Sequence, residues 1–481
     1  MHLRIFKDAK HFSSSVLVGV ILASVRSIVV LRLLGPVLIG AWKTALLVDT
    51  VGECARAGVL RGMAIRVPVL AGQGKQEEAD RTSAAAGAFL FWLGVFFFAG
   101  IFGASFLVAD PHLRLSLRFI AFSVGLSEIY FYLREVPATR HQFATRSKEE
   151  LMRALIDFTA AVALCKFLGL YGLGIATCGS LLATAVFLMR SQKVPFQFRI
   201  DGSRLSGLMR QGVPFAITEA AYEVLRRIDV FAIALVAGST AVGYYGISIL
   251  IMDFAMVLSK KGVSQLLSPH LLKEFGRTGS IADIAVFYEV PTRLFCYVLP
   301  PLLGAGTFLM SGFVRTLLPQ YTAGIGAAQV TLWSIFFVAL HFSINSFFAA
   351  SAMIPKIIRL SAVVIAISAA AQFLVMRFGF GIEGAAWCAL ATAASWAAIE
   401  LLMARTACGN SVSEAAGFIG SIYLPFAVCV ALRAVVGALP LGAPASIDAV
   451  LRAGLLLLFY VPVLIGYEMK FSMLRTVRQS L

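Results

Sequence analysis

The chain has 481 residues, of which 59% are hydrophobic and 14% charged, and its formal net charge is +16. A soluble domain is about 45–50% apolar, so this composition, with a mean hydropathy of +0.87, excludes a soluble protein and indicates an all-α polytopic membrane protein. In such a protein an excess of Lys and Arg is typical of cytoplasmic loops rather than of nucleic-acid binding. The seven cysteines form no C-x-x-C pair, so we expect no disulfide framework, metal site or cofactor.

About fourteen apolar segments are long enough to cross a hydrocarbon core of roughly 30 Å. They lie at 13–34, 39–60, 84–108, 113–136, 150–169, 172–191, 212–236, 241–263, 288–312, 324–351, 357–377, 381–404, 415–437 and 449–469. Two pairs of segments are closely spaced. The two members of each pair, within 150–191 and within 357–404, are separated by a glycine-rich segment, Gly169–Gly174 and Gly379–Gly384, which favours a tight reversal of the chain. No A-x-A-like site closes the first segment, so we expect it to be retained as a transmembrane span.

The loops between these segments alternate in charge. Most of the 41 Lys and Arg residues lie in loops on one side, whereas the opposite loops hold only Arg114, Arg315 and Arg377. Because basic residues mark cytoplasmic loops, this asymmetry predicts that both termini are cytoplasmic. The outer loops are short, and we expect no soluble domain on either side of the membrane.

The two halves of the chain resemble each other. LGPVLIGAW (Leu34–Trp42) resembles AGSTAVGYY (Ala237–Tyr245), so that Gly35 and Gly40 match Gly238 and Gly243. Six spans per half, both entering from the cytoplasm, predict parallel repeats related by an axis along the membrane normal. We therefore expect two six-helix lobes, at 1–200 and 201–408, followed by two additional transmembrane helices and a cytoplasmic tail at 409–481.

The first two spans carry charged residues at positions where a charge is costly. Arg26 and Arg32 interrupt the first span, and Asp49, Glu53 and Arg56 lie at i, i+4 and i+7, on one face of the second. A charge at bilayer depth costs roughly 2.5–3.5 kcal/mol, so these groups require partners or a watery cavity. They form either a local salt-bridged cluster or part of a hydrophilic path.

The seventh span is the most highly charged. It carries Glu219, Glu223, Arg226, Arg227 and Asp229 within an apolar helix. Glu219, Glu223 and Arg226 share a helical face, and Glu223 can pair with Arg227 four residues on. The same two interpretations apply here, because internal pairing and a hydrophilic path both satisfy buried charges.

Further polar groups within the later spans are Asp253, Arg293, His341 and Asn345. An interhelical hydrogen bond is an alternative role for the last two. Guanidinium groups bind phosphate bidentately, so the candidate contacts to an anionic or diphosphate-bearing substrate are Arg26, Arg32, Arg56, Arg226 and Arg293. The candidates for ion coupling or charge balance are Asp49, Glu53, Glu219, Glu223, Asp229 and Asp253.

The arrangement resembles the multidrug/oligosaccharidyl-lipid/polysaccharide exporter superfamily, and within it the lipid-linked oligosaccharide flippases of the polysaccharide branch. The resemblance rests on LLGPVLIGAW (Leu33–Trp42), on the pattern from Pro214 through Asp229 to Gly243-Tyr244, and on the basic connector Ile65–Arg81. It implies alternating access by two lobes and no enzymatic activity. The expected substrate is a polyprenyl-diphosphate-linked glycan for O-antigen or exopolysaccharide, carried across the bacterial cytoplasmic (inner) membrane.

The expected partners are the lipid-linked glycan, membrane lipids, and a glycan polymerase with its export machinery. Three alternatives stay open: a lipid II flippase, an ion-coupled multidrug exporter, and a non-transporting membrane scaffold of a glycan assembly complex. Energy must come from an ion gradient, the membrane potential or the substrate gradient, because the sequence contains no G-x-x-x-x-G-K-[ST] motif of an ATP-driven motor.

Overall fold

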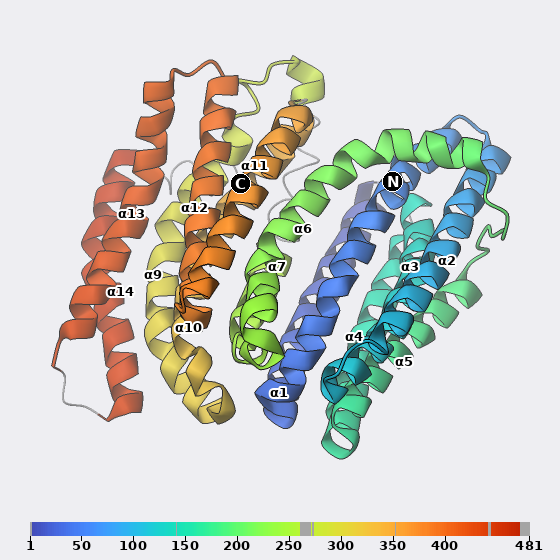
Figure 1. Cartoon of the computed structure of the whole chain (residues 1–481). Helices are drawn as coiled ribbons and strands as arrows, with labels where there is room; N and C mark the ends of the chain where they lie inside the picture. The colour runs from blue at the N-terminus through green and yellow to red at the C-terminus, as the bar shows by residue number, and fades with distance from the viewer. Residues whose placement is uncertain are drawn as a thin grey trace. The chain divides into compact units, whose positions relative to one another are not determined.

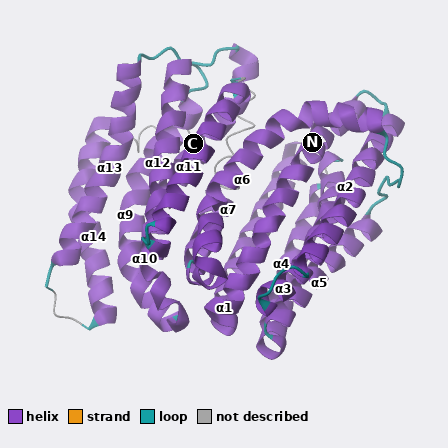
Figure 2. Ribbon diagram, viewed as in Figure 1, coloured by secondary structure: helices purple, strands orange, loops and turns teal. Residues whose placement is uncertain are grey.

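The structure, a computed structural model, describes residues 2–140, 142–259, 271, 274–351, 353–440 and 444–471. These residues form helices and connecting loops, with no strand among them (Figure 2). The predicted all-α fold is therefore confirmed. Contacts divide the chain into two compact units, Met1–Gly246 with Ile357–Ile365, and Ile247–Lys356 with Ala366–Leu481. The predicted lobe boundaries, at 200 and 408, stay a prediction.

The first unit contains six long helices (Figure 1). They are α1 (His2–Gly72), α2 (Gln76–Ser105), α3 (Pro111–Thr139), α4 (Phe143–Leu168), α5 (Leu170–Ser191) and α6 (Gly202–Tyr244). Helix α1 packs against α2, α3, α4 and α6. The core of this unit includes Met63 of α1, Leu90 of α2, Tyr130 and Tyr132 of α3, and Leu208 of α6, each fully buried.

The second unit contains the remaining helices. They are α7 (Gly246–Ser259), α9 (Val286–Leu317), η2 (Pro319–Gly324), α10 (Ile325–Ala350), most of α11 (Ile354–Arg377), α12 (Gly381–Ala407), α13 (Val412–Ala438) and α14 (Ala445–Phe471). Helix α9 packs against α10, α13 and α14, and α10 also packs against α12. The last residues of the predicted eighth span, 260–263, lie outside the described residues.

Most predicted spans coincide with helices, and the main difference lies at the first two. Helix α1 continues through both of them, with a kink at Gly35 (φ 71°, ψ 174°) in place of a loop. Helix α6 has an equivalent kink at Gly238 (φ 81°, ψ 178°). Positive φ is a conformation that glycine adopts without steric cost, so the glycines matched between the two halves share one unusual backbone geometry.

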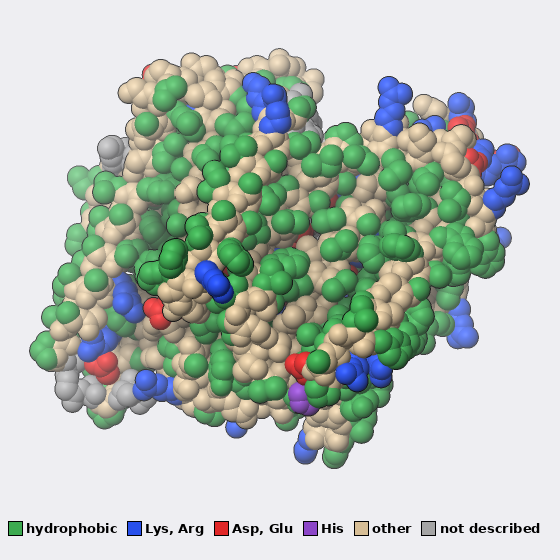
Figure 3. Space-filling model, in the orientation of Figure 1, with side chains coloured by type: hydrophobic (Ala, Val, Ile, Leu, Met, Phe, Trp, Pro, Cys, Tyr) green, Lys and Arg blue, Asp and Glu red, His purple; other side chains and the backbone are tan. Residues whose placement is uncertain are grey.

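Nine of the described helices are long and apolar enough to span a membrane, one of them being the two-span stretch Val18–Gly72, and the bent pair α6 and α7 would be a tenth. On the face drawn in Figure 3, hydrophobic atoms dominate and most visible Lys and Arg atoms lie toward the margins. The multi-pass membrane character predicted from the composition is therefore supported by the described helices.

Candidate functional site

Close backbone contacts between α1 and α6 set the position of the site. A Cβ atom built on Gly40 would lie 2.8 Å from the carbonyl carbon of Ser239, and one built on Gly243 would lie 2.6 Å from that of Pro36. Pro36 and Ser239 follow the two kink glycines, so the contact is reciprocal, as expected for repeat-related segments. Only glycine permits so close an approach of two helix backbones.

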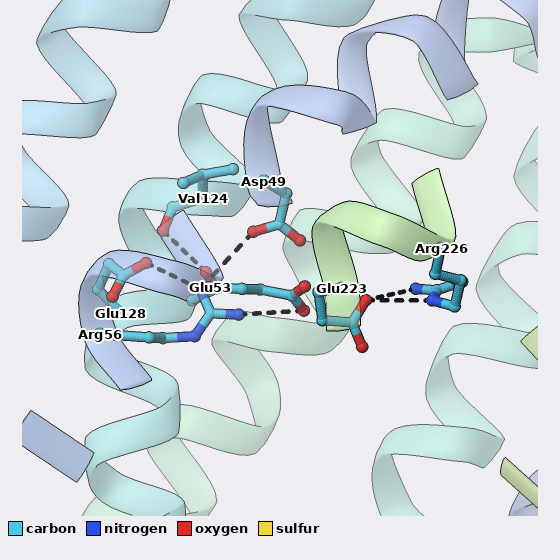
Figure 4. Close-up of polar contacts among 8 residues, drawn as sticks. Asp49, Glu53, Arg56, Val124, Glu128, Glu223 and Arg226 are labelled. Atoms are coloured by element: carbon cyan, nitrogen blue, oxygen red, sulfur yellow. Dashed lines mark hydrogen bonds and ion pairs between the residues drawn. The ribbon is translucent and has the colours of Figure 1, made fainter. Parts of the chain in front are cut away.

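Arg56 of α1 is the centre of the charged groups in the first unit. Its side chain is 5% exposed and lies 2.9 Å from Glu128 of α3, 3.4 Å from Glu53 and 3.7 Å from Asp49 (Figure 4). The guanidinium also lies over the ring of Phe131, 4.3 Å from its centroid. Three carboxylates and one aromatic face thus surround a single buried cation, which satisfies the need of a buried charge for partners.

Helix α6 extends this group of charges. Arg226 lies 2.8 Å from Glu223, and Glu53 is close enough to Glu223 and Arg227 for their charges to interact. Figure 4 shows the carboxylate of Glu53 directed toward that of Glu223. The observed partner of Glu223 is Arg226 at i+3, whereas the sequence also suggested Arg227 at i+4. The Nε of Arg227 is buried without a hydrogen-bond partner.

We call these seven residues the charged cluster: Asp49, Glu53, Arg56, Glu128, Glu223, Arg226 and Arg227. It contains four carboxyl groups and three guanidinium groups, so its formal charge is negative when every group is ionised. One oxygen of Glu128, whose side chain is fully buried, has no hydrogen-bond partner, and neither has one oxygen of Asp49. The cluster therefore contains carboxylate oxygens that could accept further hydrogen bonds.

Other predicted residues of the first unit lie in separate contacts. Glu219 forms a two-point ion pair with Arg61 of α1, and both side chains are more exposed than the cluster. Asp229 accepts a hydrogen bond of 2.7 Å from the hydroxyl of Tyr245. The structure thus places Glu219, Glu223 and Asp229 of the same helix in three different environments.

The arginines of the first span do not join the charged cluster. Arg26 lies 2.9 Å from Asp157 of α4, with both side chains partly exposed. Arg32 is exposed. In the described part of α1, then, only Arg56 among the predicted arginines contacts the charges of the second span.

The predicted residues of the second unit also occupy separate positions. Arg293 of α9 lies over the ring of Phe418 at 5.2 Å. His341 of α10 is buried, and its Nδ1 lies 2.9 Å from both oxygens of Glu400 on α12. Asp253 lies on α7 and is half-buried, and Asn345 of α10 is exposed.

The sequence reasoning did not identify three of the carboxylates that face these residues. Glu128, Asp157 and Glu400 each come from a helix other than that of their partner. Helical spacing relates residues three or four positions apart, so it carries no information on such partners. A lone acidic residue within an apolar span is itself a signal, and by that signal all three could have been identified.

Among the described residues, no group of three or more His, Cys, Asp or Glu side chains is arranged to hold a metal ion. The residues of the charged cluster can form ion pairs, bind phosphate through their guanidinium groups, and exchange protons through their carboxyl groups.

The comparisons with known proteins agree with this picture. Residues 72–276 match the family described as polysaccharide biosynthesis protein. No significantly similar sequence was found among curated proteins. The fold is similar to that of the lipid II flippase MurJ in an inward closed conformation, with a TM-score of 0.69 and 12% identity over 94% of this chain and 98% of that one.

Multidrug resistance MATE family transporters have a similar fold. An inward-facing structure gives a TM-score of 0.64 at 12% identity, over 81% of this chain and 94% of that one. An outward-facing structure gives 0.61 at 12% identity, over 84% and 96%. These neighbours are transporters and flippases rather than enzymes. The chain thus folds like these multidrug resistance transporters and the lipid II flippase, and its residues 72–276 match the family described as polysaccharide biosynthesis protein.

Proposed function

We propose that this protein is a flippase that moves a polyprenyl-diphosphate-linked oligosaccharide or polysaccharide repeat unit across the bacterial cytoplasmic membrane. The observation that carries the proposal is the charged cluster, which brings three guanidinium groups together among apolar helices. The family match to polysaccharide biosynthesis proteins supports a glycan substrate. A diphosphate is the part of such a substrate that is hardest to move through lipid, because it is charged.

Within the cluster, the arginines of α6 are better suited than Arg56 to meet the headgroup. Arg56 is enclosed by three carboxylates and a ring, and breaking such a buried arrangement is costly. Arg226 forms an ion pair with Glu223 of its own helix, and the side chain of Glu223 is 24% exposed, so this pair is more accessible than that of Arg56 with the fully buried Glu128. If a phosphate of the substrate replaces the Glu223 carboxylate, the Arg226 guanidinium keeps an anionic hydrogen-bond acceptor.

The transport cycle proposed here is alternating access by the two repeat-related lobes, 1–200 and 201–408. The isoprenyl chain stays in the bilayer while the headgroup passes the charged cluster. Both termini are cytoplasmic in this proposal, because the basic loops lie on their side. The glycan is then available on the outer surface to a polymerase and export machinery for O-antigen or exopolysaccharide.

Flipping in proteoliposomes tests the proposal. A fluorescent short-chain polyprenyl-diphosphate oligosaccharide is placed in both leaflets, and the fraction that a glycosidase in the external medium can reach is followed over time. We expect wild type to make the inner-leaflet pool accessible, and Arg226→Ala to slow this exchange at least about tenfold, as expected for the loss of roughly 1.4 kcal/mol. Arg226→Lys keeps the charge but loses the bidentate geometry, so it falls between the two.

The matched control is Arg81→Ala, which removes an exposed arginine paired with Glu77 at the start of α2. It is expected to flip at the wild-type rate. Equal rates for wild type, Arg226→Ala and Arg81→Ala would refute the headgroup role of Arg226. Absence of flipping by wild type refutes the flippase proposal itself.

The same assay can distinguish the alternative functions by their substrates. The four carboxyl groups of the cluster favour a cation as the second candidate substrate, so efflux of a cationic dye by wild type, without glycan flipping, would identify an ion-coupled multidrug exporter. Lipid II also carries a diphosphate. The same assay with labelled lipid II in place of the labelled oligosaccharide therefore shows which of the two substrates the protein flips. A scaffold would support neither activity and would tolerate charge reversal at Arg226.

A further inference from the structure

The chain between α5 and α6, residues 192–201, contains no helix and runs along the edge of the first unit (Figure 1). We call this segment the connector. Its Val194 side chain packs against the core of the unit. Three apolar side chains at every second position, Phe196, Phe198 and Ile200, are instead 42%, 65% and 45% exposed. An exposed apolar patch of this kind marks an interaction surface.

The backbone of the connector is hydrogen-bonded by side chains of the neighbouring helices. The carbonyl of Phe198 accepts a bond of 3.0 Å from the indole N–H of Trp92 on α2, and that of Lys193 accepts one of 2.7 Å from Arg140 at the end of α3. The carbonyl of Pro195 accepts a third bond, from a tyrosine of α3. A non-helical segment in contact with lipid needs such partners, because no water replaces them there.

The exposed rings of the connector are held in place by a third ring. Phe91 of α2 meets Phe196 and Phe198 edge to face, with ring centroids 6.1 and 5.4 Å apart, and these two rings meet each other at 5.1 Å. Edge-to-face contacts are a favoured geometry for aromatic pairs. The two exposed rings are therefore part of a packed aromatic group rather than freely turning side chains.

The exposed residues of α2 change in character at Trp92. Before it, the last exposed residue is Arg81, and residues 82–91 are all buried or half-buried. Trp92 is 47% exposed, and beyond it every exposed residue of α2 lacks a polar side chain. Tryptophan is enriched where a membrane meets water. We therefore infer that Trp92, and the connector carbonyl bonded to it, lie at the level of the lipid headgroups.

Cationic side chains accompany this apolar patch. Arg190 at the end of α5, and Lys193 and Arg199 in the connector, are exposed, and none of them forms an ion pair with a described residue. Residues 190–200 contain no Asp or Glu. The exposed Arg81 of α2, by contrast, is paired with a carboxylate of its own helix. Exposed cations beside exposed aromatic rings are complementary to an anionic lipid, which carries its negative headgroup directly above its acyl chains.

We propose that the connector binds anionic phospholipids in the leaflet that faces the basic loops. Phe196, Phe198 and Ile200 lie among the upper parts of the acyl chains, while Lys193 and Arg199 contact the headgroups. The inference goes beyond the proposed function, because it holds for any substrate. The connector leads directly into α6, the helix that carries three residues of the charged cluster, so the bound lipid is adjacent to the start of that helix.

The test is quenching of tryptophan fluorescence by brominated phospholipids in vesicles that contain the full-length protein. The chain has five tryptophans, so the signal of Trp92 is the difference between each variant and the same variant with Trp92→Phe. Vesicles in which either phosphatidylglycerol or phosphatidylcholine is brominated give the ratio of the binding constants of the two lipids. Bromine atoms near the headgroup or near the chain end report depth. Phe198→Trp, in the Trp92→Phe background, places the same reporter in the connector.

We expect both reporters to be quenched, and more strongly by bromine near the headgroup. Phosphatidylglycerol should be preferred by roughly fivefold for each cation that contacts it. The preference should fall in the double variant Lys193→Gln/Arg199→Gln. The matched control is Arg81→Gln, which removes one exposed but paired cation from the helix of Trp92 and should keep the wild-type preference.

Two results would overturn different parts of the proposal. Absence of quenching at both reporters would show that the connector faces water, and stronger quenching by bromine near the chain end would refute its place at the headgroups. Quenching without a preference for phosphatidylglycerol, or with an equal preference in the double variant and in Arg81→Gln, would refute the binding of anionic headgroups by Lys193 and Arg199. No flipping substrate is present in this experiment, so its failure leaves the proposed function untouched.

Discussion

Replacement of Gly243 by alanine is expected to weaken the contact between α1 and α6. A Cβ atom at this position would lie 2.6 Å from the carbonyl carbon of Pro36, well inside the separation of any real Cβ contact. The obstacle is backbone rather than a flexible side chain, so the helices themselves must separate. Overpacking of this kind typically costs about 1–3 kcal/mol, which corresponds to a shift of about 5- to 150-fold between two conformations.

The assay combines thermal unfolding with labelling of a cysteine introduced at Ser239, whose carbonyl lies against Gly40. The seven native cysteines are first replaced. We expect Gly243→Ala to lower the unfolding midpoint and to increase labelling by a hydrophilic maleimide. The matched control is Gly179→Ala in α5, where an added Cβ meets nothing within 4 Å and alanine favours the helix by up to about 1 kcal/mol. Equal labelling and equal midpoints in the two variants would refute the reasoning.

Three further outcomes are expected. Glu128→Leu removes the shortest ion pair of the buried Arg56 and should destabilise the protein by up to about 3–5 kcal/mol. Glu128→Gln retains a hydrogen-bond acceptor and should cost less. Equal unfolding midpoints for the two variants would contradict this expectation. His341→Leu and Glu400→Leu each remove one side of the buried contact between these two residues and should cost about 1–3 kcal/mol. The double variant should cost less than the sum of the two, and strict additivity in a double-mutant cycle would show that the pair does not interact. A hydrogen bond from the backbone N–H of Arg204 lowers the pKa of Asp201, the N-cap of α6, so its stabilisation is present above the ordinary Asp pKa of about 3.9 and is lost as the pH falls through the lower folded-state pKa. Hydrogen exchange in the first turn of α6, corrected for intrinsic rates, should show this loss in wild type and not in Asp201→Ala.

The helices could be predicted well from the sequence, because the length of an apolar segment and the glycines that end it are local features of the chain. The reversal at Gly169–Gly174 occurs where α4 ends, with φ of 55° at Gly169. The match of Gly35 with Gly238 was also visible in the sequence, and both adopt the same positive-φ geometry. The continuity of α1 through Gly35 was not predicted, because a glycine followed by Pro36 is as typical of a loop as of a kink.

The site was predicted only in part, for a different reason. The spacing of Asp49, Glu53 and Arg56 indicated one helix face, and these side chains do converge. The partner that lies closest to Arg56, Glu128, is 72 residues away in the chain. Helix periodicity places a residue on a face, but the neighbour of that face is determined by packing between helices. The same limit applies to Glu400 opposite His341.

The pairing of cluster arginines with carboxylates bears on how a flippase can release its substrate. A cavity of unpaired arginines would hold a diphosphate strongly, because each desolvated guanidinium would gain its only partner. In the proposed exchange, the headgroup gains only the difference between its own ion pair with Arg226 and the one that Glu223 already makes. A translocation site must bind well enough to admit its cargo and weakly enough to release it. The internal carboxylates lower the affinity toward that range.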